Sequence, residues 1–185
     1  QRQMCIRDSP ITNPIFYVIT TLGNAGWFWI VLAVLMLTVL PKKYKKAGLT
    51  MAIALILSLI FCNGIMKHLW ARAFWVVGQN FVVGNEFENL YGIFNSIHDY
   101  SFPSGHSSAS FAAAVSIFMW RKKEGSAALV LAALIAFSRL YFTVHYPTDV
   151  LVGTITGALY GVAAYFIVKA LMNKVPKLNA IFNKQ

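Results

Sequence analysis

Residues 47–66 read AGLTMAIALILSLIFCNGIM, a run without a single charged side chain. A helix needs about 20 such residues to cross the hydrocarbon core of a bilayer. Three further stretches, 24–40, 126–144 and 149–172, have a similar length and apolar character. The segment 106–120 is shorter but rich in Ser and Ala, small residues that let helices approach closely inside a membrane. We therefore predict an all-α fold, a polytopic membrane helical bundle with about five transmembrane helices.

The composition of the whole chain supports this class. Of its 185 residues 58% are hydrophobic and only 12% are charged, whereas a soluble domain has about 25% charged residues. A soluble enzyme and a disordered tail are thereby disfavoured. The two cysteines, Cys5 and Cys62, lie far apart in the sequence, which indicates neither a disulfide scaffold nor a metal site.

The basic residues indicate how the chain is oriented. Eleven of the sixteen lie in three segments, 41–46, 121–124 and 169–184. With five spans these segments fall on one face, which the positive-inside rule makes cytoplasmic. The net charge of +10 is then a property of cytoplasmic loops, and we expect no nucleic-acid partner. We predict a multi-pass protein of a bacterial plasma membrane.

The N-terminal residues differ from the rest. Residues 1–10 show no signal-peptide layout and do not begin with Met, so we interpret them as a leader outside the domain, of native or foreign origin. Residues 11–185 are predicted to form a single membrane-embedded domain. Within it, the apolar stretch 11–22 is too short to span, and we expect a short interfacial helix with Pro14 in its first turn.

The extracytoplasmic face of the predicted bundle collects the titratable residues, including all four histidines and five of the six acids. Three clusters lie at the outer ends of the spans: Lys67 with Arg72, the segment 103–106, and the segment 138–149. Because consecutive spans are antiparallel, we expect the three clusters to lie at one membrane depth and to converge.

Two of these clusters carry cations near the membrane, Lys67 and Arg139, which are costly there without a partner or a function. Pro103 suits the first position of a helix, which would leave the backbone N–H groups of Ser104–His106 free to bind an anion. The pattern predicts a phosphate site. Its candidate ligands are Lys67, Arg72, Ser104, Gly105 and Arg139, with Arg72 left open between phosphate and lipid headgroup.

Two histidines and a carboxylate accompany the phosphate site. His145 and Asp149 are four residues apart, and a helix that begins near Pro147 would let Asp149 reach one ring nitrogen of His145. The other nitrogen could attack phosphorus, while His106 supplies the proton that the leaving group needs. No acidic cluster of the kind that holds Mg²⁺ is present in the sequence. We predict phosphoryl transfer without metal or cofactor, through a phosphohistidine.

The motifs resemble those of the type 2 phosphatidic acid phosphatase superfamily, membrane lipid phosphatases related to vanadium haloperoxidases. That family carries Lys-x6-Arg-Pro, Pro-Ser-Gly-His and Ser-Arg-x5-His-x3-Asp. The second motif is complete at 103–106 and the third at 138–149. The resemblance implies that His145 is the nucleophile, Asp149 its orienting partner and His106 the acid. It implies that the phosphate oxygens are held by Lys67, Ser104, Gly105 and Arg139.

The same resemblance implies a hydrolase that acts on lipid phosphates or pyrophosphates, of the phosphatidic acid, phosphatidylglycerol phosphate or undecaprenyl pyrophosphate class. Its partners would be the lipid substrate and the bilayer. The first motif departs from the family, because Phe74 and Trp75 stand where Arg and Pro are expected after Lys67. The alternative is therefore a relative that binds lipid phosphates but is impaired in catalysis.

Two other classes are less favoured. A transporter would place charged residues along a path within the spans, whereas here they gather at one face, and the spans themselves disfavour a haloperoxidase. The remaining aromatic and histidine residues match no motif. We expect an interfacial aromatic belt of Trp27, Trp29, Trp70, Trp75 and Tyr100, and interface or loop positions for His68 and His98.

Overall fold

The structure is a computed structural model that describes residues 11–70, 100–142 and 144–175. All regular elements of the described chain are helical, as predicted. In chain order they are α2 (Thr12–Gly23), η1 (Asn24–Gly26), α3 (Trp27–Thr38), η2 (Lys42–Tyr44), α4 (Lys45–Leu57), η3 (Ser58–Met66), α5 (Lys67–Trp70), α7 (Gly105–Trp120), α8 (Lys122–Tyr141) and α9 (Pro147–Lys174). The elements η1 and η2 are short 3-10 helices, and η3 is π-helical.

Four stretches of the described chain are long and apolar enough to cross a bilayer: Thr12–Thr38, Lys42–Trp70, Lys122–Tyr141 and Pro147–Lys174. Large apolar side chains stand exposed on their outer surfaces, among them Val130 and Leu159 with 62% and 60% of their surface accessible. An exterior of this kind suits lipid rather than water. The chain is a multi-pass membrane protein.

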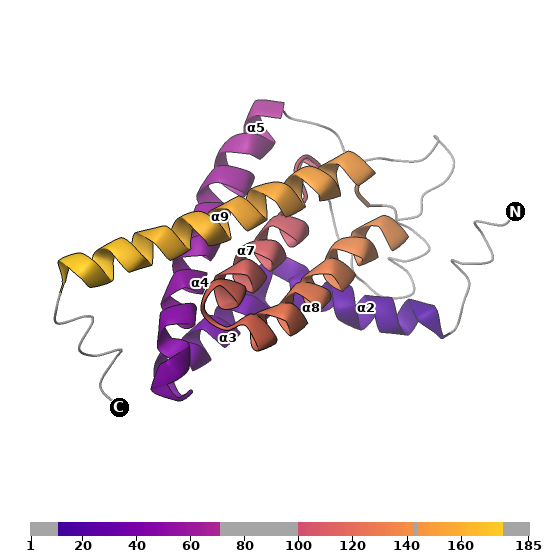
Figure 1. Ribbon diagram of the computed structural model, residues 1–185. Helices are drawn as coiled ribbons and strands as arrows, with labels where there is room; N and C mark the ends of the chain where they lie inside the picture. Colours follow the sequence, from indigo (N-terminus) through magenta and orange to yellow (C-terminus); the bar gives the residue numbers. More distant parts are fainter. Residues whose placement is uncertain (1–10, 71–99, 143, 176–185) are drawn as a thin grey trace, which may run out of the picture.

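The helix α7 occupies the middle of the bundle, with α9 on one side and α8 on the other (Figure 1). Its 16 residues make it about 24 Å long. It begins beside Lys67, with which Gly105 shares a cavity, and it ends at Arg121, which lies against Tyr44. It therefore runs from one end of the bundle to the other, although it is not among the four long apolar stretches given above.

The contact between α7 and α9 depends on glycine. A Cβ atom added to Gly157 would lie 2.3 Å from the carbonyl oxygen of Ser108. Gly153 and Gly161, about one turn to either side, face the backbone of α7 at 2.6 and 2.9 Å in the same way. Small residues of this spacing let membrane helices touch backbone to backbone. This close contact fixes where the N-terminal ends of α7 and α9 lie relative to each other.

A second core lies where α3, α4, α7 and α8 meet, and it corrects one prediction. Trp29 has only 1% of its surface exposed, and its indole Nε1 donates a hydrogen bond of 3.1 Å to Ser110. The assignment of Trp29 to an interfacial belt was therefore wrong. Trp27 and Trp70, by contrast, are exposed at 46% and 59%.

The N-terminal helix α2 is separate from α3, close to the predicted boundary. The break falls in η1, where Ala25 and Gly26 have positive φ angles of 49° and 67°. Pro14 lies in the first turn of α2, as expected. The helix packs against α8, with the ring of Phe16 stacked on Tyr141 at 4.4 Å between centroids. This packing brings the end of α2 to the start of α7.

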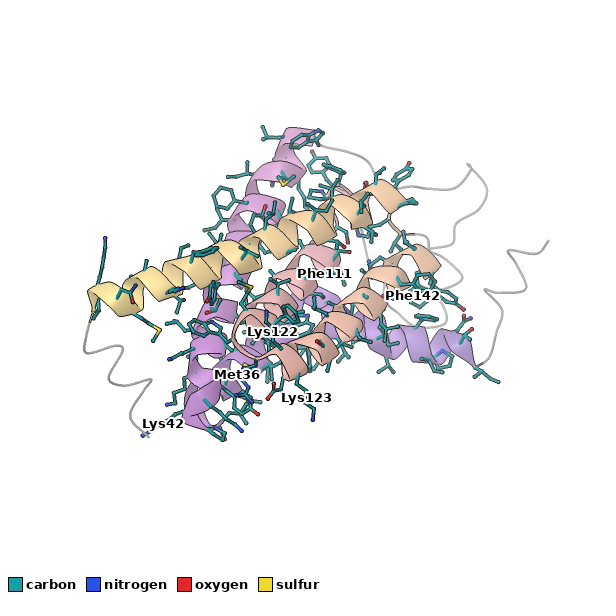
Figure 2. The ribbon with its side chains drawn as sticks, viewed as in Figure 1. Met36, Lys42, Phe111, Lys122, Lys123 and Phe142 are labelled. Atoms are coloured by element: carbon teal, nitrogen blue, oxygen red, sulfur yellow. The ribbon has the colours of Figure 1, made fainter. Side chains whose placement is uncertain are left out.

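The basic loops gather at one end of the bundle. Tyr44, which precedes α4, donates a hydrogen bond of 3.4 Å to Glu124 at the start of α8. Arg121 forms an ion pair of 2.6 Å with the same carboxylate. Figure 2 shows Lys123 at this end of α8 and Phe142 at the other end. The two basic segments that precede α4 and α8 thus share one face, as the charge pattern predicted.

Candidate active site

Lys67 marks the end of the second span that faces away from the basic loops. It follows the π-helix η3 and begins α5, and only 7% of its surface is exposed. A lysine that merely reached out to lipid headgroups would be far more accessible. Wide helical turns such as η3 occur often at functional sites. Lys67 is therefore a cation held inside the protein.

The segment 103–106 forms the start of α7, but not in the predicted manner. Ser104 is the N-cap residue and Gly105 is the first helical residue, so Pro103 precedes the helix instead of opening it. The Ser104 hydroxyl accepts a hydrogen bond of 3.4 Å from the backbone N–H of Ser107. The backbone N–H of Ser104 donates to the carbonyl oxygen of Asp149 at 3.0 Å. The first-turn N–H groups left without an acceptor within the helix are thus those of Gly105 and His106.

The third cluster is built as the spacing predicted. The helix α9 begins at Pro147, and the carboxylate of Asp149 lies 3.7 Å from Nδ1 of His145. Asp149 is fully buried and also accepts a hydrogen bond of 3.1 Å from the backbone N–H of Tyr146. In this arrangement Nδ1 of His145 faces the carboxylate, so Nε2 is the ring nitrogen that does not face Asp149.

His145 lies in the turn between α8 and α9, and its surface is only 4% exposed. Burial lowers the pKa of His145 below its ordinary value, and the neighbouring carboxylate of Asp149 opposes that shift. Arg139 and Lys67 lower the pKa of His145 further through their positive charges. The imidazole is consequently neutral at physiological pH, which is the state in which a ring nitrogen can act as a nucleophile.

Arg139 is buried near the end of α8, with 6% of its surface exposed. Its Nη1 donates a hydrogen bond of 2.7 Å to the hydroxyl of Thr20 on α2. Its Nε has no hydrogen-bond partner among the described residues. A buried guanidinium with an unsatisfied donor is costly unless an anion completes it. The neighbouring Ser138 instead binds within its own helix, donating to the carbonyl oxygen of Ile135 at 2.6 Å.

These groups converge as the antiparallel spans predicted. His106 interacts electrostatically with Lys67, Arg139 and His145, which come from three other parts of the chain. Two buried cations, two imidazoles and a helix N-terminus therefore surround one place. Such a set of donors is suited to a phosphate group.

A cavity of about 660 Å³ opens from this place into the apolar part of the bundle. Lys67, Gly105 and His106 line its polar end. The rest of its wall comes mainly from α3 and α4, with side chains such as Val34 and Ile56. The cavity thus joins the charged cluster to surroundings that suit a hydrocarbon chain.

Some predicted residues cannot be placed. Arg72, Phe74, Trp75 and His98 lie outside the described residues. His68 lies outside the cluster, as expected: it is exposed, and its Nδ1 lies 2.9 Å from the backbone oxygen of Gly64.

Three polar residues near the site were not predicted from the sequence. Thr20 contacts Arg139, Asn24 lies 2.9 Å from Nε2 of His106, and Asn63 lies against Gly105. Thr20 and Asn24 precede the first motif by more than forty residues and belong to no recognisable pattern. Asn63 lies four residues before Lys67, so the helical spacing was the one signal that could have placed it near the site.

Comparison with known proteins agrees with the geometry. A family model of the PAP2 superfamily matches residues 44–173. The protein "Putative undecaprenyl-diphosphatase YbjG" of Escherichia coli K12 is 30% identical over 167 residues, which cover 89% of this chain and 74% of the relative. A lipid A 4′-phosphatase of Bacteroides thetaiotaomicron is 30% identical over 178 residues, covering 91% of this chain and 77% of the relative.

Two crystal structures share the fold. Aquifex aeolicus LpxE matches with a TM-score of 0.60 and 21% identity, covering 88% of this chain and 91% of that one. A PAP2-type phosphatidylglycerolphosphate phosphatase of Bacillus subtilis matches with a TM-score of 0.60 and 23% identity, covering 94% of this chain and 86% of that one. The helical arrangement described above is therefore shared with transmembrane proteins of this type.

Proposed function

Because the chain belongs to the PAP2 superfamily, we propose that it hydrolyses a lipid phosphate or lipid pyrophosphate through a phosphohistidine at His145, without a metal ion. The observation that carries this proposal is the convergence of buried cations and imidazoles, of which Lys67 and His106 line the polar end of an apolar cavity. A phosphate ester attached to a hydrocarbon chain has the matching distribution of charge and apolar surface.

The proposed binding step uses the cations and the start of α7. Lys67 and Arg139 contact the phosphate oxygens, and the unsatisfied Nε of Arg139 gains an acceptor. The first-turn N–H groups of α7 at Gly105 and His106 add neutral donors. Ser104 contributes through its hydroxyl and by capping this turn, and Arg72 remains a further candidate ligand.

The proposed chemistry proceeds in two displacements. Nε2 of His145 attacks phosphorus, the bond from phosphorus to the leaving oxygen breaks, and His106 donates a proton to that oxygen. Water then attacks phosphorus and gives a proton to His106, while the bond between phosphorus and His145 breaks and phosphate leaves. Asp149 orients His145 and stabilises the positive charge that its ring carries in the intermediate.

The same proposal extends to location and substrate. We place the site on the extracytoplasmic face of a bacterial plasma membrane, because the basic loops lie at the opposite end. We assign α2, which packs on α8, to one domain that covers residues 11–185. The substrate class is suggested by relatives named for undecaprenyl diphosphate and for lipid A, both of which are phosphorylated lipids.

The test measures phosphate release by detergent-purified protein in EDTA. Substrates are phosphatidic acid, phosphatidylglycerol phosphate and undecaprenyl pyrophosphate, and the variants are His145→Ala and His68→Ala. We expect release that survives chelation, is lost in His145→Ala and is unchanged in His68→Ala, because His68 is an exposed histidine outside the site. Release that requires a divalent metal, or that persists in His145→Ala, would contradict the mechanism.

The rival function, binding without turnover, rests on Phe74 and Trp75 at the positions of the family's Arg-Pro pair. It predicts that the folded protein binds these lipids but releases no phosphate from any of them. In that case Phe74→Arg is the informative variant, and recovery of phosphate release would identify the missing guanidinium as the cause.

A further inference from the structure

The junction between α2 and α3 reaches the ring of His106. Asn24, the first residue of η1, places its side-chain oxygen 2.9 Å from Nε2 of His106, although 82 residues separate the two in sequence. An amide oxygen can only accept a hydrogen bond. The contact is therefore a hydrogen bond in the tautomer of His106 that carries its hydrogen on Nε2.

A second contact from the same junction fixes the plane of the ring. A Cβ atom added to Gly23 would lie 2.7 Å from Cδ2 and 3.4 Å from Cγ of His106. The Cγ–Cδ2 edge thus packs on the backbone of Gly23, and Nε2 is held by Asn24. The opposite edge of the ring, Nδ1 and Cε1, is the part that points away from α2 and η1.

The backbone explains how Asn24 is held in place. Ala25 and Gly26 adopt positive φ angles directly after it, so the chain turns sharply at this point and both residues line the cavity. One turn earlier on α2, the hydroxyl of Thr20 accepts a hydrogen bond from Arg139 at 2.7 Å. A single corner of the chain therefore contacts both His106 and Arg139.

We propose that Asn24 is a positioning residue for His106: by accepting the Nε2 hydrogen, it leaves Nδ1 as the nitrogen that exchanges a proton with the leaving group and then with water. This proposal rests on the phosphatase function proposed above. It assigns a role to a residue before the segment matched by the family model, which begins at residue 44. A histidine held by one fixed acceptor can give and take protons through its other nitrogen without rotating.

Several charged groups surround His106 and bear on the pH dependence expected for variants of Asn24. Lys67 faces it from the end of the second span, Arg139 from α8 and His145 from the turn before α9. Among the described residues, the carboxylate next to these groups is that of Asp149, which lies beside His145. An acceptor at Nε2 favours the protonated ring, so the loss of that acceptor in a variant is expected to make His106 a stronger acid.

Three variants test the assignment through the pH dependence of kcat. The acid must be protonated, so kcat falls as the pH rises through the pKa of His106. Asn24→Ala removes the acceptor, and we expect kcat to fall about 10–100-fold, on the scale of a lost orienting partner, with little change in KM and with the alkaline decline moved to lower pH. Asn24→Asp replaces the amide oxygen by a carboxylate, which should restore much of kcat and move the decline to higher pH.

Asn13→Ala is the matched control. Asn13 is an asparagine of the neighbouring helix α2, and its side-chain oxygen accepts a hydrogen bond of 2.6 Å from Tyr141, away from the site. We expect it to leave kcat and the pH profile unchanged. A purely structural role for Asn24 would lower the amount of active protein in both Asn24 variants without moving the profile in opposite directions. Identical profiles in Asn24→Ala, Asn24→Asp and the parent protein would overturn the proposal.

A measurement that does not depend on turnover separates this inference from the proposed function. In protein with ¹⁵N-labelled histidine, the ring signals of His106 are assigned by their loss in His106→Gln. We expect the neutral tautomer with hydrogen on Nε2, and a mixture of tautomers in Asn24→Ala. A ring with hydrogen on Nδ1 in the parent protein would refute the role of Asn24 even if the enzyme is active. The expected tautomer in a protein that releases no phosphate would support the contact and reject only the proposed reaction.

Discussion

At the end of the bundle where α7 stops, Arg121 and Glu124 form an ion pair of 2.6 Å whose side chains remain 30% and 34% exposed. At the end where α7 begins, Lys67 and Arg139 are 7% and 6% exposed, and Asp149 is fully buried. The charges at both ends are those that the dipole of α7 favours: the cation Arg121 lies next to its C-terminus, and an anion site is proposed at its N-terminus. The two ends differ in solvation, because the charged side chains at the first end are partly exposed to solvent and those at the second end are buried.

That difference indicates what each end is for. Exposed ion pairs contribute little to stability, and positive loops beside a membrane set the orientation of the chain. Buried cations cost free energy in the folded state unless an anion offsets their charge. The cation-rich buried end is therefore where a charged ligand has the largest effect on the protein.

The largest expected effect comes from breaking the contact that sets the positions of α7 and α9. Gly157→Leu puts a side chain where even a Cβ would lie 2.3 Å from the backbone of Ser108, and we expect a cost of about 3 kcal/mol or more. Little folded protein should be recovered from detergent, as judged by size-exclusion chromatography and thermal unfolding. Ala163→Leu introduces the same side chain at an exposed position of α9 and should leave the yield and Tm close to those of the parent. Equal losses in both variants would show that the glycine contact does not hold the two helices together.

The next largest effect compares one arginine from each end. Arg139→Met removes the buried guanidinium, and we expect kcat for lipid phosphate hydrolysis to fall about 10²–10³-fold, the scale of a lost donor to a charged transition state. Arg121→Met removes an exposed guanidinium and should leave kcat unchanged. Folded protein is compared by circular dichroism before the rates are measured. Similar losses in the two variants would mean that burial does not distinguish the two ends.

A smaller effect concerns the carboxylate beside His145. Attack requires neutral His145, so kcat/KM rises with pH through the pKa of this residue, which burial lowers from an ordinary value of about 6.5. The acid limb of the profile should therefore lie below that value. Asp149→Asn removes the charge that opposes the shift, so we expect the limb to move to still lower pH while kcat falls about 10–100-fold. A limb that moves to higher pH would contradict the assigned role of Asp149.

Much of the buried end could be predicted because its residues lie in short motifs. The spacing of His145, Pro147 and Asp149 fixes a helix start and a contact across one turn, and both are present in the structure. The meeting of three clusters followed from the antiparallel order of the spans. These inferences need only local geometry and the alternation of direction across a membrane.

The unpredicted features depend on contacts between distant parts of the chain. Asn24 meets His106 across 82 residues, and a single polar residue at the start of an apolar run carries no local pattern. Trp29 was assigned to the interface by residue type alone, but its indole nitrogen has a partner, Ser110, inside the bundle. The glycines of α9 were likewise read as part of an apolar span, whereas their role depends on the backbone of α7.

The smallest expected effect lies at the exposed end. Glu124→Gln removes the negative charge that pairs with Arg121 but keeps an oxygen that can accept from Tyr44. Both side chains of the pair are partly in water, where salt screens them. We expect unchanged kcat and a small decrease in Tm at low salt that disappears at high salt. The two ends are joined by α7 itself, since Arg121 follows its last residue and Gly105 is its first. A decrease in kcat at unchanged Tm would therefore mean that the exposed end influences the site along this helix, and the division of labour between the two ends would have to be abandoned.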